Sequence, residues 1–247
     1  MFSISVLENN RLIIESIVRW KSLFVDTLVD LVAKDSKLKD VRQRVYRLEK
    51  KGIIESKLFQ HSKKLVFPSS EFLLLLGRQH AENLNQDLLR HQSLTALIGS
   101  SLLEFDYAQS FLLSEEIPKS NFQTNILDFP DALMTIDHRG VEFKVAVEVQ
   151  AWKKINLMSD YKIIKLLKNH DHDYVFIFCA DRLTFNSYKL RVRSLIENSS
   201  YKIFEERIKD NVVLFLLDCQ TFHVRDLGEC VIWRDGEEST FRKLLKR

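Results

Sequence analysis

One segment near the middle of the chain, residues 125–154, constrains the fold most strongly, because it has the pattern of a β-hairpin. Pro130 and Asp131 open a short apolar stretch, a polar turn follows at 137–140, and residues 141–150 have Val or Phe at every odd position. Such alternation is typical of a strand with one buried face. Gly140 provides the backbone freedom that a tight turn needs. The segment therefore predicts two neighbouring antiparallel strands.

Two acidic residues, Asp131 and Glu148, fall on the two strands of this hairpin. On the second strand Lys144, Glu148 and Gln150 share a face, because side chains alternate between the faces of a sheet. Carboxylates held by strands bind a hard divalent cation through oxygen, and such a cation polarises a phosphate and acidifies a water molecule. We therefore predict that Asp131 and Glu148 bind Mg²⁺ or Mn²⁺ for phosphodiester cleavage.

These residues resemble the motifs of the PD-(D/E)XK nuclease superfamily. The pair at 130–131 is similar to its first motif, and Glu148-Val149-Gln150 is similar to its second, except that Gln150 stands where the superfamily usually has lysine. The resemblance implies that Asp131, Glu148 and Gln150 are catalytic. Three lysines that follow in the sequence could provide the cation that position 150 lacks: Lys153 and Lys154 just past the strand, and Lys162 one to two helical turns further on.

The chain more closely resembles the replication-relaxation group and the MOBC class of plasmid mobilisation relaxases. The resemblance depends on the PDAL segment at 130–133, the strand end at 148–150, and the Lys-rich helix that contains Tyr161 and Lys162. It implies a winged helix joined to a PD-(D/E)XK-like domain in one chain. It also implies a metal-dependent enzyme that nicks duplex DNA at a plasmid origin of transfer, in company with other mobilisation proteins.

The N-terminal residues 1–70 have the pattern of a winged helix-turn-helix domain. Helices are predicted at 8–20, 24–33 and 37–51, followed by two short strands at 53–59 and 63–67. The third helix has an apolar stripe, and the opposite surface offers Lys39, Arg42, Gln43, Tyr46, Arg47 and Lys50. A helix of this kind fits the major groove of DNA, and Lys63 and Lys64 of the wing could reach the backbone. A protein-binding winged helix, or a merely solvated basic face, is the alternative.

The distribution of charge agrees with a DNA-binding N-terminal domain. Residues 1–70 contain 14 Lys and Arg against 8 Asp and Glu, a net charge of +6, whereas the remainder contains 23 against 26, a net charge of −3. A basic domain joined to a slightly acidic one is expected to meet the polyanion first.

The remaining residues, 71–247, are predicted to form the α/β nuclease-like domain, so that the whole chain is α+β. A first strand is predicted at 109–113, before the hairpin. After the hairpin we predict a helix at 155–168, a strand at 174–179, a helix at 185–198 and a strand at 212–217. Three widely spaced cysteines suggest reduced thiols. No membrane-length apolar run and no signal peptide are apparent, so we expect a cytoplasmic protein.

Three functions remain open from the sequence. The first is the nicking relaxase; the second is a non-catalytic regulator of plasmid replication or transcription, which Gln150 favours; the third is a dimeric endonuclease that cuts both strands. A tyrosine relaxase with a histidine-bound metal is not expected, because His170 and His172 flank Asp171 in a predicted loop. Tyr161 is a minor alternative nucleophile, and Glu115 or Glu116 could add a metal ligand.

Overall fold

The computed structural model describes residues 4–32, 38–58, 63–78, 86–118, 129–151, 160–168, 172–217 and 227–245. The chain is α+β and divides into two compact units, Met1–Ser100 and Ser101–Arg247. Among the described residues, no helix has the length and apolar character needed to span a bilayer.

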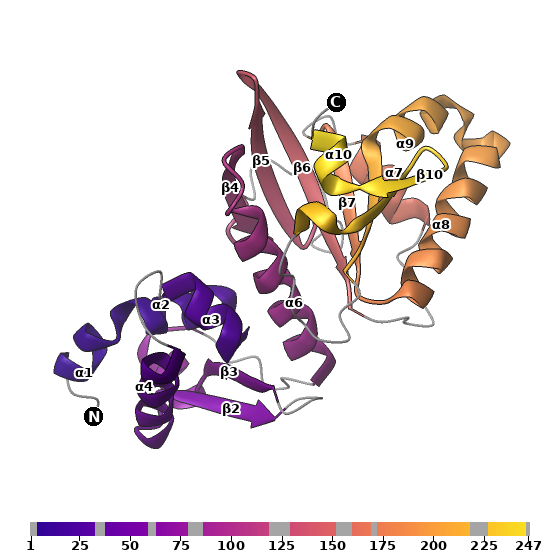
Figure 1. The fold of residues 1–247 in the computed structure, drawn as a ribbon. Coiled ribbons are helices and arrows are strands. Elements are labelled where there is room, and N and C mark those ends of the chain that lie inside the picture. Colours follow the sequence, from indigo (N-terminus) through magenta and orange to yellow (C-terminus); the bar gives the residue numbers. More distant parts are fainter. Residues whose placement is uncertain are drawn as a thin grey trace. The chain divides into compact units, whose positions relative to one another are not determined.

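The first unit consists of helices and a small antiparallel sheet in which β3 lies between β1 and β2. Its elements, in chain order, are α1 (Ile4–Asn9), α2 (Arg11–Trp20), β1 (Leu23–Phe24), α3 (Val25–Val32), α4 (Leu38–Lys50), β2 (Ile54–Leu58), β3 (Lys64–Pro68), α5 (Ser70–Leu75) and α6 (Gln86–Leu102) (Figure 1). The helix predicted at 8–20 is thus two helices that meet at Asn10, and β1 is an addition to the predicted strands.

Helix α4 follows the prediction closely. Val41, Val45 and Leu48 are buried, so the apolar stripe faces the core of the unit. The helix ends at Lys50, and Gly52 adopts a positive φ of 69° while its amide donates to the carbonyl of Glu49. A glycine in this conformation is the usual end of a helix, because it has no Cβ to clash with the backbone.

Helix α6 explains why the first unit extends to Ser100 rather than to residue 70. The Ser22 hydroxyl, next to β1, donates to the carbonyl of Leu89 at 2.9 Å and lies 2.6 Å from the hydroxyl of Ser93. Ser22 and Ser93 are both completely buried. These contacts bind α6 to the N-terminal helices, and an unpaired hydroxyl at this depth would be costly.

The second unit is built on a mixed sheet with the strand order β10-β9-β8-β7-β6-β5-β4. Strands β6, β7 and β8 are parallel to one another, and every other neighbouring pair is antiparallel. Its elements are β4 (Ala108–Leu113), β5 (Ala132–His138), β6 (Val141–Gln150), α7 (Asp160–Lys168), β7 (Tyr174–Cys179), α8 (Arg182–Glu197), the 3₁₀ helix η4 (Ser199–Phe204), α9 (Glu205–Asn211), β8 (Val212–Leu216), the 3₁₀ helix η5 (Leu227–Glu229), β9 (Val231–Arg234), β10 (Glu237–Thr240) and α10 (Phe241–Leu245).

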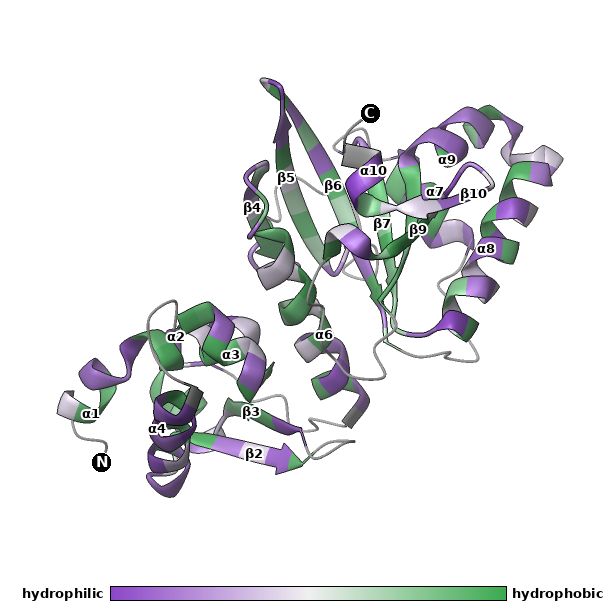
Figure 2. Cartoon of the chain, in the orientation of Figure 1, coloured by the Kyte–Doolittle hydropathy of each residue, from purple (hydrophilic) through white to green (hydrophobic). Residues whose placement is uncertain are grey.

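Both faces of this sheet are covered. On one face Ala146, Ile177 and Leu214 pack under α7, α8 and α9 in one apolar core. On the other face the rings of Phe176 and Phe215 contact Phe241 of α10. Figure 2 shows the apolar colour concentrated in the central strands and polar residues distributed over the helices. Continuous apolar strands of this kind are expected where a parallel sheet is buried on both sides.

The predicted strands of this unit agree with β4, β5, β6, β7 and β8. Helix α8 begins at Arg182, earlier than predicted, because Asp181 caps it by accepting hydrogen bonds from the amide and hydroxyl of Thr184. The predicted helix at 155–168 is described only from Asp160 onward. The hairpin β9–β10 and the helices α9 and α10 are additions to the predicted elements.

Candidate active site

The β5–β6 hairpin brings Asp131 and Glu148 together. Its turn consists of Arg139 and Gly140 alone, both with positive φ, so that His138 pairs with Val141. Ala132 pairs with Val147 in this register, and Asp131 therefore lies opposite Glu148. A carboxylate oxygen of Asp131 accepts a hydrogen bond of 2.7 Å from the amide of Val149, which orients the side chain at the start of β5.

Glu148 is buried on the face of the sheet that α7, α8 and α9 cover. It follows Ala146 on that face by the strand alternation, and only 1% of the residue is exposed. Lys162 reaches it from α7, with Nζ 2.7 Å from Oε1 of Glu148. Ile163 and Ile164, the next residues of α7, are buried in the core and hold the helix over the strand. The sheet and the crossover helix thus form a buried ion pair.

The acidity of Glu148 follows from these surroundings. Burial raises the pKa of its carboxyl group, the negative charge of Asp131 raises it further, and Lys162 lowers it, with a result of about 8. Glu148 Oε1 is buried, and the ammonium group of Lys162 contacts it from the side of α7. A buried carboxylate oxygen in this state, opposite a second carboxylate, fits a divalent cation.

Gln150 lies on the same face as Glu148 and is half-buried. Its backbone carbonyl accepts a hydrogen bond from the backbone amide of Ala180, just past the end of β7. It has no positive charge to offer. Lys153 and Lys154, the predicted catalytic lysines, lie outside the described residues. Lys162, which the sequence suggested only as a further candidate, contacts Glu148.

The other acidic candidates do not join the pair. Glu116 accepts a hydrogen bond of 2.9 Å from the amide of Leu113, and Glu115 lies 3.4 Å from the hydroxyl of Ser114. Within the parts of the chain that the structure describes, no group of three His, Cys, Asp or Glu residues could hold a metal. The described protein ligands for a cation here are thus two carboxylates, which suits Mg²⁺, an ion that keeps several water ligands.

The predicted DNA-binding residues of α4 share one exposed face. Lys39, Arg42, Gln43, Tyr46, Arg47 and Lys50 are all exposed. Arg42 lies 3.1 Å from Asp26 of α3, and the ammonium group of Lys50 lies 4.9 Å from the centre of the Tyr46 ring. Of the wing residues, Lys63 and Lys64 are half-buried, and Lys64 is paired with Glu49 at 2.5 Å. The helix therefore offers a broader cationic surface than the wing.

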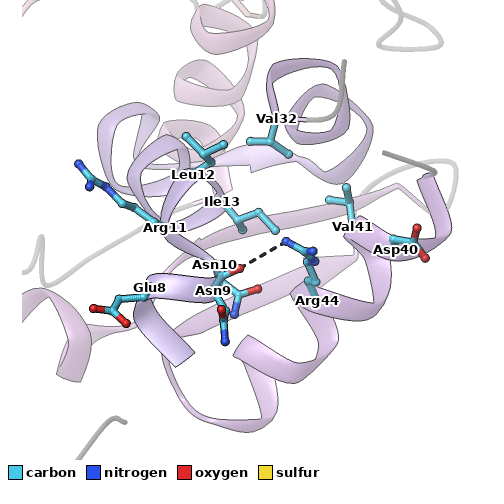
Figure 3. A pocket seen from close by; sticks show the side chains of 10 residues that line it. All are labelled: Glu8, Asn9, Asn10, Arg11, Leu12, Ile13, Val32, Asp40, Val41 and Arg44. Carbon is cyan, nitrogen blue, oxygen red and sulfur yellow. Dashed lines mark hydrogen bonds between the residues drawn. The ribbon is translucent and has the colours of Figure 1, made fainter. Parts of the chain in front are cut away.

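A small pocket lies on the other side of α4, beside α1 and α2 (Figure 3). Arg44 points into it and donates a hydrogen bond of 3.3 Å to the carbonyl of Asn9. Its volume of about 160 Å³ is below the range of ordinary ligand sites. Arg44 is thus exposed like its neighbours on α4, but its guanidinium group is held at the carbonyl of Asn9.

Two carboxylates with a lysine from a neighbouring helix can bind a cation and offset negative charge on a phosphate. They lie near the carboxyl end of β6, where parallel sheets commonly bind ligands. The arrangement suits metal-assisted phosphodiester chemistry. Compared with protein-family models, curated proteins and solved structures, the chain has no match.

Proposed function

We propose that this protein is a cytoplasmic, metal-dependent enzyme that nicks one strand of duplex DNA. The observation that carries the proposal is the buried ion pair of Glu148 and Lys162 beside Asp131. Charges are expensive to bury and are commonly found where chemistry needs them. Here the three groups are two carboxyl groups and one lysine ammonium group, which are the kinds of group that a phosphodiester-cleaving site requires.

The order of elements around the pair supports a PD-(D/E)XK-like domain. The antiparallel strands β4, β5 and β6, helix α7 and the parallel strand β7 follow one another as expected for that fold. The missing lysine of the second motif has a substitute of the same charge, because Lys162 Nζ lies within 2.7 Å of Glu148.

A winged helix in the first unit is supported in the same way. The order of helices and strands from α2 to β3, and the position of β3 between β1 and β2, are those expected of such a domain. The exposed basic face of α4 would read the major groove, with Arg and Gln toward base edges and Lys toward phosphates.

In the proposed mechanism each residue has a limited role. Asp131 and Glu148 hold Mg²⁺ or Mn²⁺, which when bound supplies a Lewis acid and a more acidic water. Lys162 lowers the raised pKa of Glu148, which makes it easier for an arriving cation to displace the proton, and it offsets charge on the phosphate during cleavage. Gln150, on the same face, orients the scissile phosphate through its amide. The resemblance to MOBC-class relaxases suggests an origin of transfer as the target and plasmid mobilisation as the process.

A non-catalytic DNA-binding regulator is the second candidate. Gln150 in place of lysine favours it, and so does Lys162, which can neutralise Glu148 without any metal. In that case the carboxylate pair would be a structural remnant and α4 would be the functional surface.

Incubation of supercoiled plasmid with the protein and Mg²⁺ or Mn²⁺ separates the candidates. The assay is run on plasmids with and without a candidate origin. Open circles support the proposal, linear molecules indicate an endonuclease that cuts both strands, and unchanged plasmid favours the regulator. Glu148→Gln and Asp131→Asn should each abolish cleavage but leave DNA binding intact. Glu142→Gln is a matched control, since Glu142 is an exposed residue of the same strand.

A further inference from the structure

The outward face of α7 has a line of aromatic and cationic side chains. Ile163, Ile164, Leu166 and Leu167 are buried, so the helix presents Tyr161, Lys165 and Lys168 on its other side. Residues separated by three or four positions are neighbours on a helix surface. The three side chains therefore form one continuous strip, which the nicking chemistry does not use.

Aromatic rings and ammonium groups alternate along this strip. The Nζ of Lys165 lies 5.3 Å from the centre of the Tyr161 ring, and the Nζ of Lys168 lies 5.1 Å from the centre of the Phe204 ring, where η4 meets α9. Tyr161 keeps 63% of its surface exposed. An aromatic ring this exposed can stack on a base, and ammonium groups beside such a ring can contact phosphates.

The strip begins beside the carboxylates. Tyr161 directly precedes Lys162, whose ammonium group contacts Glu148. Consecutive helical residues point about 100° apart, so α7 directs one side chain to the site and the next to the surface. The acidic residue at this end, Asp160, is paired with Arg191 at 2.5 Å, which offsets its charge.

We infer that Tyr161, Lys165 and Lys168 form a binding surface for an unpaired DNA strand, with a base stacked on Tyr161 and phosphates on the two lysines. In a duplex each base is stacked between the neighbouring bases, so a duplex would contact the lysines through its phosphates but would not stack a base on Tyr161. An unpaired strand uses both. The inference extends the proposed function, because it makes locally opened DNA the substrate of the site.

The test measures the binding of a fluorescently labelled oligo-dT to the full chain by anisotropy, with EDTA present to prevent cleavage. Tyr161→Ala should weaken this binding by about 5- to 150-fold, the range for removal of one base–aromatic stack. Tyr161→Phe keeps the ring and should bind like the wild type. Lys165→Gln and Lys168→Gln should each lower the salt dependence by about 0.7 in slope, because each lysine neutralises one phosphate of the single strand.

Tyr46→Ala is the matched control. Tyr46 is also an exposed tyrosine, 51% exposed, with a lysine over its ring. It lies on α4, so its removal should weaken duplex binding and leave oligo-dT binding unchanged, while Tyr161→Ala should do the reverse.

The inference would be overturned if Tyr161→Ala bound oligo-dT as tightly as the wild type does. It would also be overturned if Tyr161→Ala and Tyr46→Ala weakened oligo-dT binding equally. Tighter binding of oligo-U than of oligo-dT would also overturn it, by making RNA the ligand. Because binding is measured without cleavage, a protein that binds oligo-dT through Tyr161 but leaves plasmid intact sinks the nicking proposal alone.

Discussion

At the scale of single residues, the ion pair of Glu148 and Lys162 is the feature that most constrains function. Its two members come from a strand and a helix, and the carboxylate is buried while the lysine keeps 23% of its side chain exposed. Burying a charge costs several kcal/mol unless a partner offsets it. The pair therefore indicates either a cation site or an expensive structural link.

Replacement of Lys162 by Met should separate these roles. Without the lysine, the pKa of the buried Glu148 should rise further, and the free energy of unfolding in urea should fall by about 1–3 kcal/mol because the contact with Lys162 is lost. Plasmid nicking should be abolished. Lys144→Met, an exposed lysine on the same strand face, should change neither measurement. Wild-type nicking by Lys162→Met would exclude the lysine from the mechanism.

At the scale of elements, helix α4 and the β5–β6 hairpin have separate tasks, and each depends on local conformation. In α4 the buried apolar stripe fixes which side chains face outward. In the hairpin the two-residue turn fixes the register and so the opposition of Asp131 and Glu148. A slip of one residue would move every side chain of a strand to the other face.

Two arginines of α4 provide a matched pair. Arg47 lies on the exposed face, whereas the guanidinium of Arg44 is directed to the carbonyl of Asn9. Arg47→Gln should weaken duplex binding and lower the slope of log affinity against log salt by about 1, because one phosphate is then no longer neutralised. Arg44→Gln should change binding much less. Equal effects of the two substitutions in a salt titration would contradict an interface on the exposed face.

Gly140 should matter through its backbone alone. Its φ is +80°, and a Cβ built there would meet no atom within 4 Å. Gly140→Ala should therefore cost about 1–2 kcal/mol of stability from the left-handed conformation without any clash. Urea unfolding measures the cost. An unchanged midpoint would mean that the turn relaxes, and the register of the carboxylates would then depend on the sheet instead.

At the scale of the whole molecule, the chain combines a basic helical unit with a mixed-sheet unit. Each has its own buried core, so recognition and cleavage are expected to be separable by mutation. The contacts of Ser22 with α6 make this helix part of the first unit.

A fragment of residues 1–100 should therefore unfold cooperatively and bind duplex DNA at low salt. A fragment of residues 1–70 lacks α6 and leaves Ser22 without Leu89 and Ser93, so it should be less stable. Thermal unfolding followed by circular dichroism compares the two. Equal melting temperatures would show that α6 contributes nothing to the unit.

Local patterns in the sequence determined the parts whose conformation depends on near neighbours. The alternation at 141–150 predicted β6, the apolar run at 174–179 predicted β7, and the spacing of Val41, Val45 and Leu48 predicted the buried side of α4. Each of these patterns repeats with the period of its own element, so it can be recognised without knowledge of the fold.

Only the tertiary structure revealed that Lys162 meets Glu148. Lys162 stands twelve positions after Gln150 in the sequence, and its ammonium group contacts Glu148. The crossover from β6 to β7 returns α7 over the sheet, and the burial of Ile163 and Ile164 sets the rotation of the helix. Distance along the chain could not reveal this contact, because it arises from the packing of a helix on a strand.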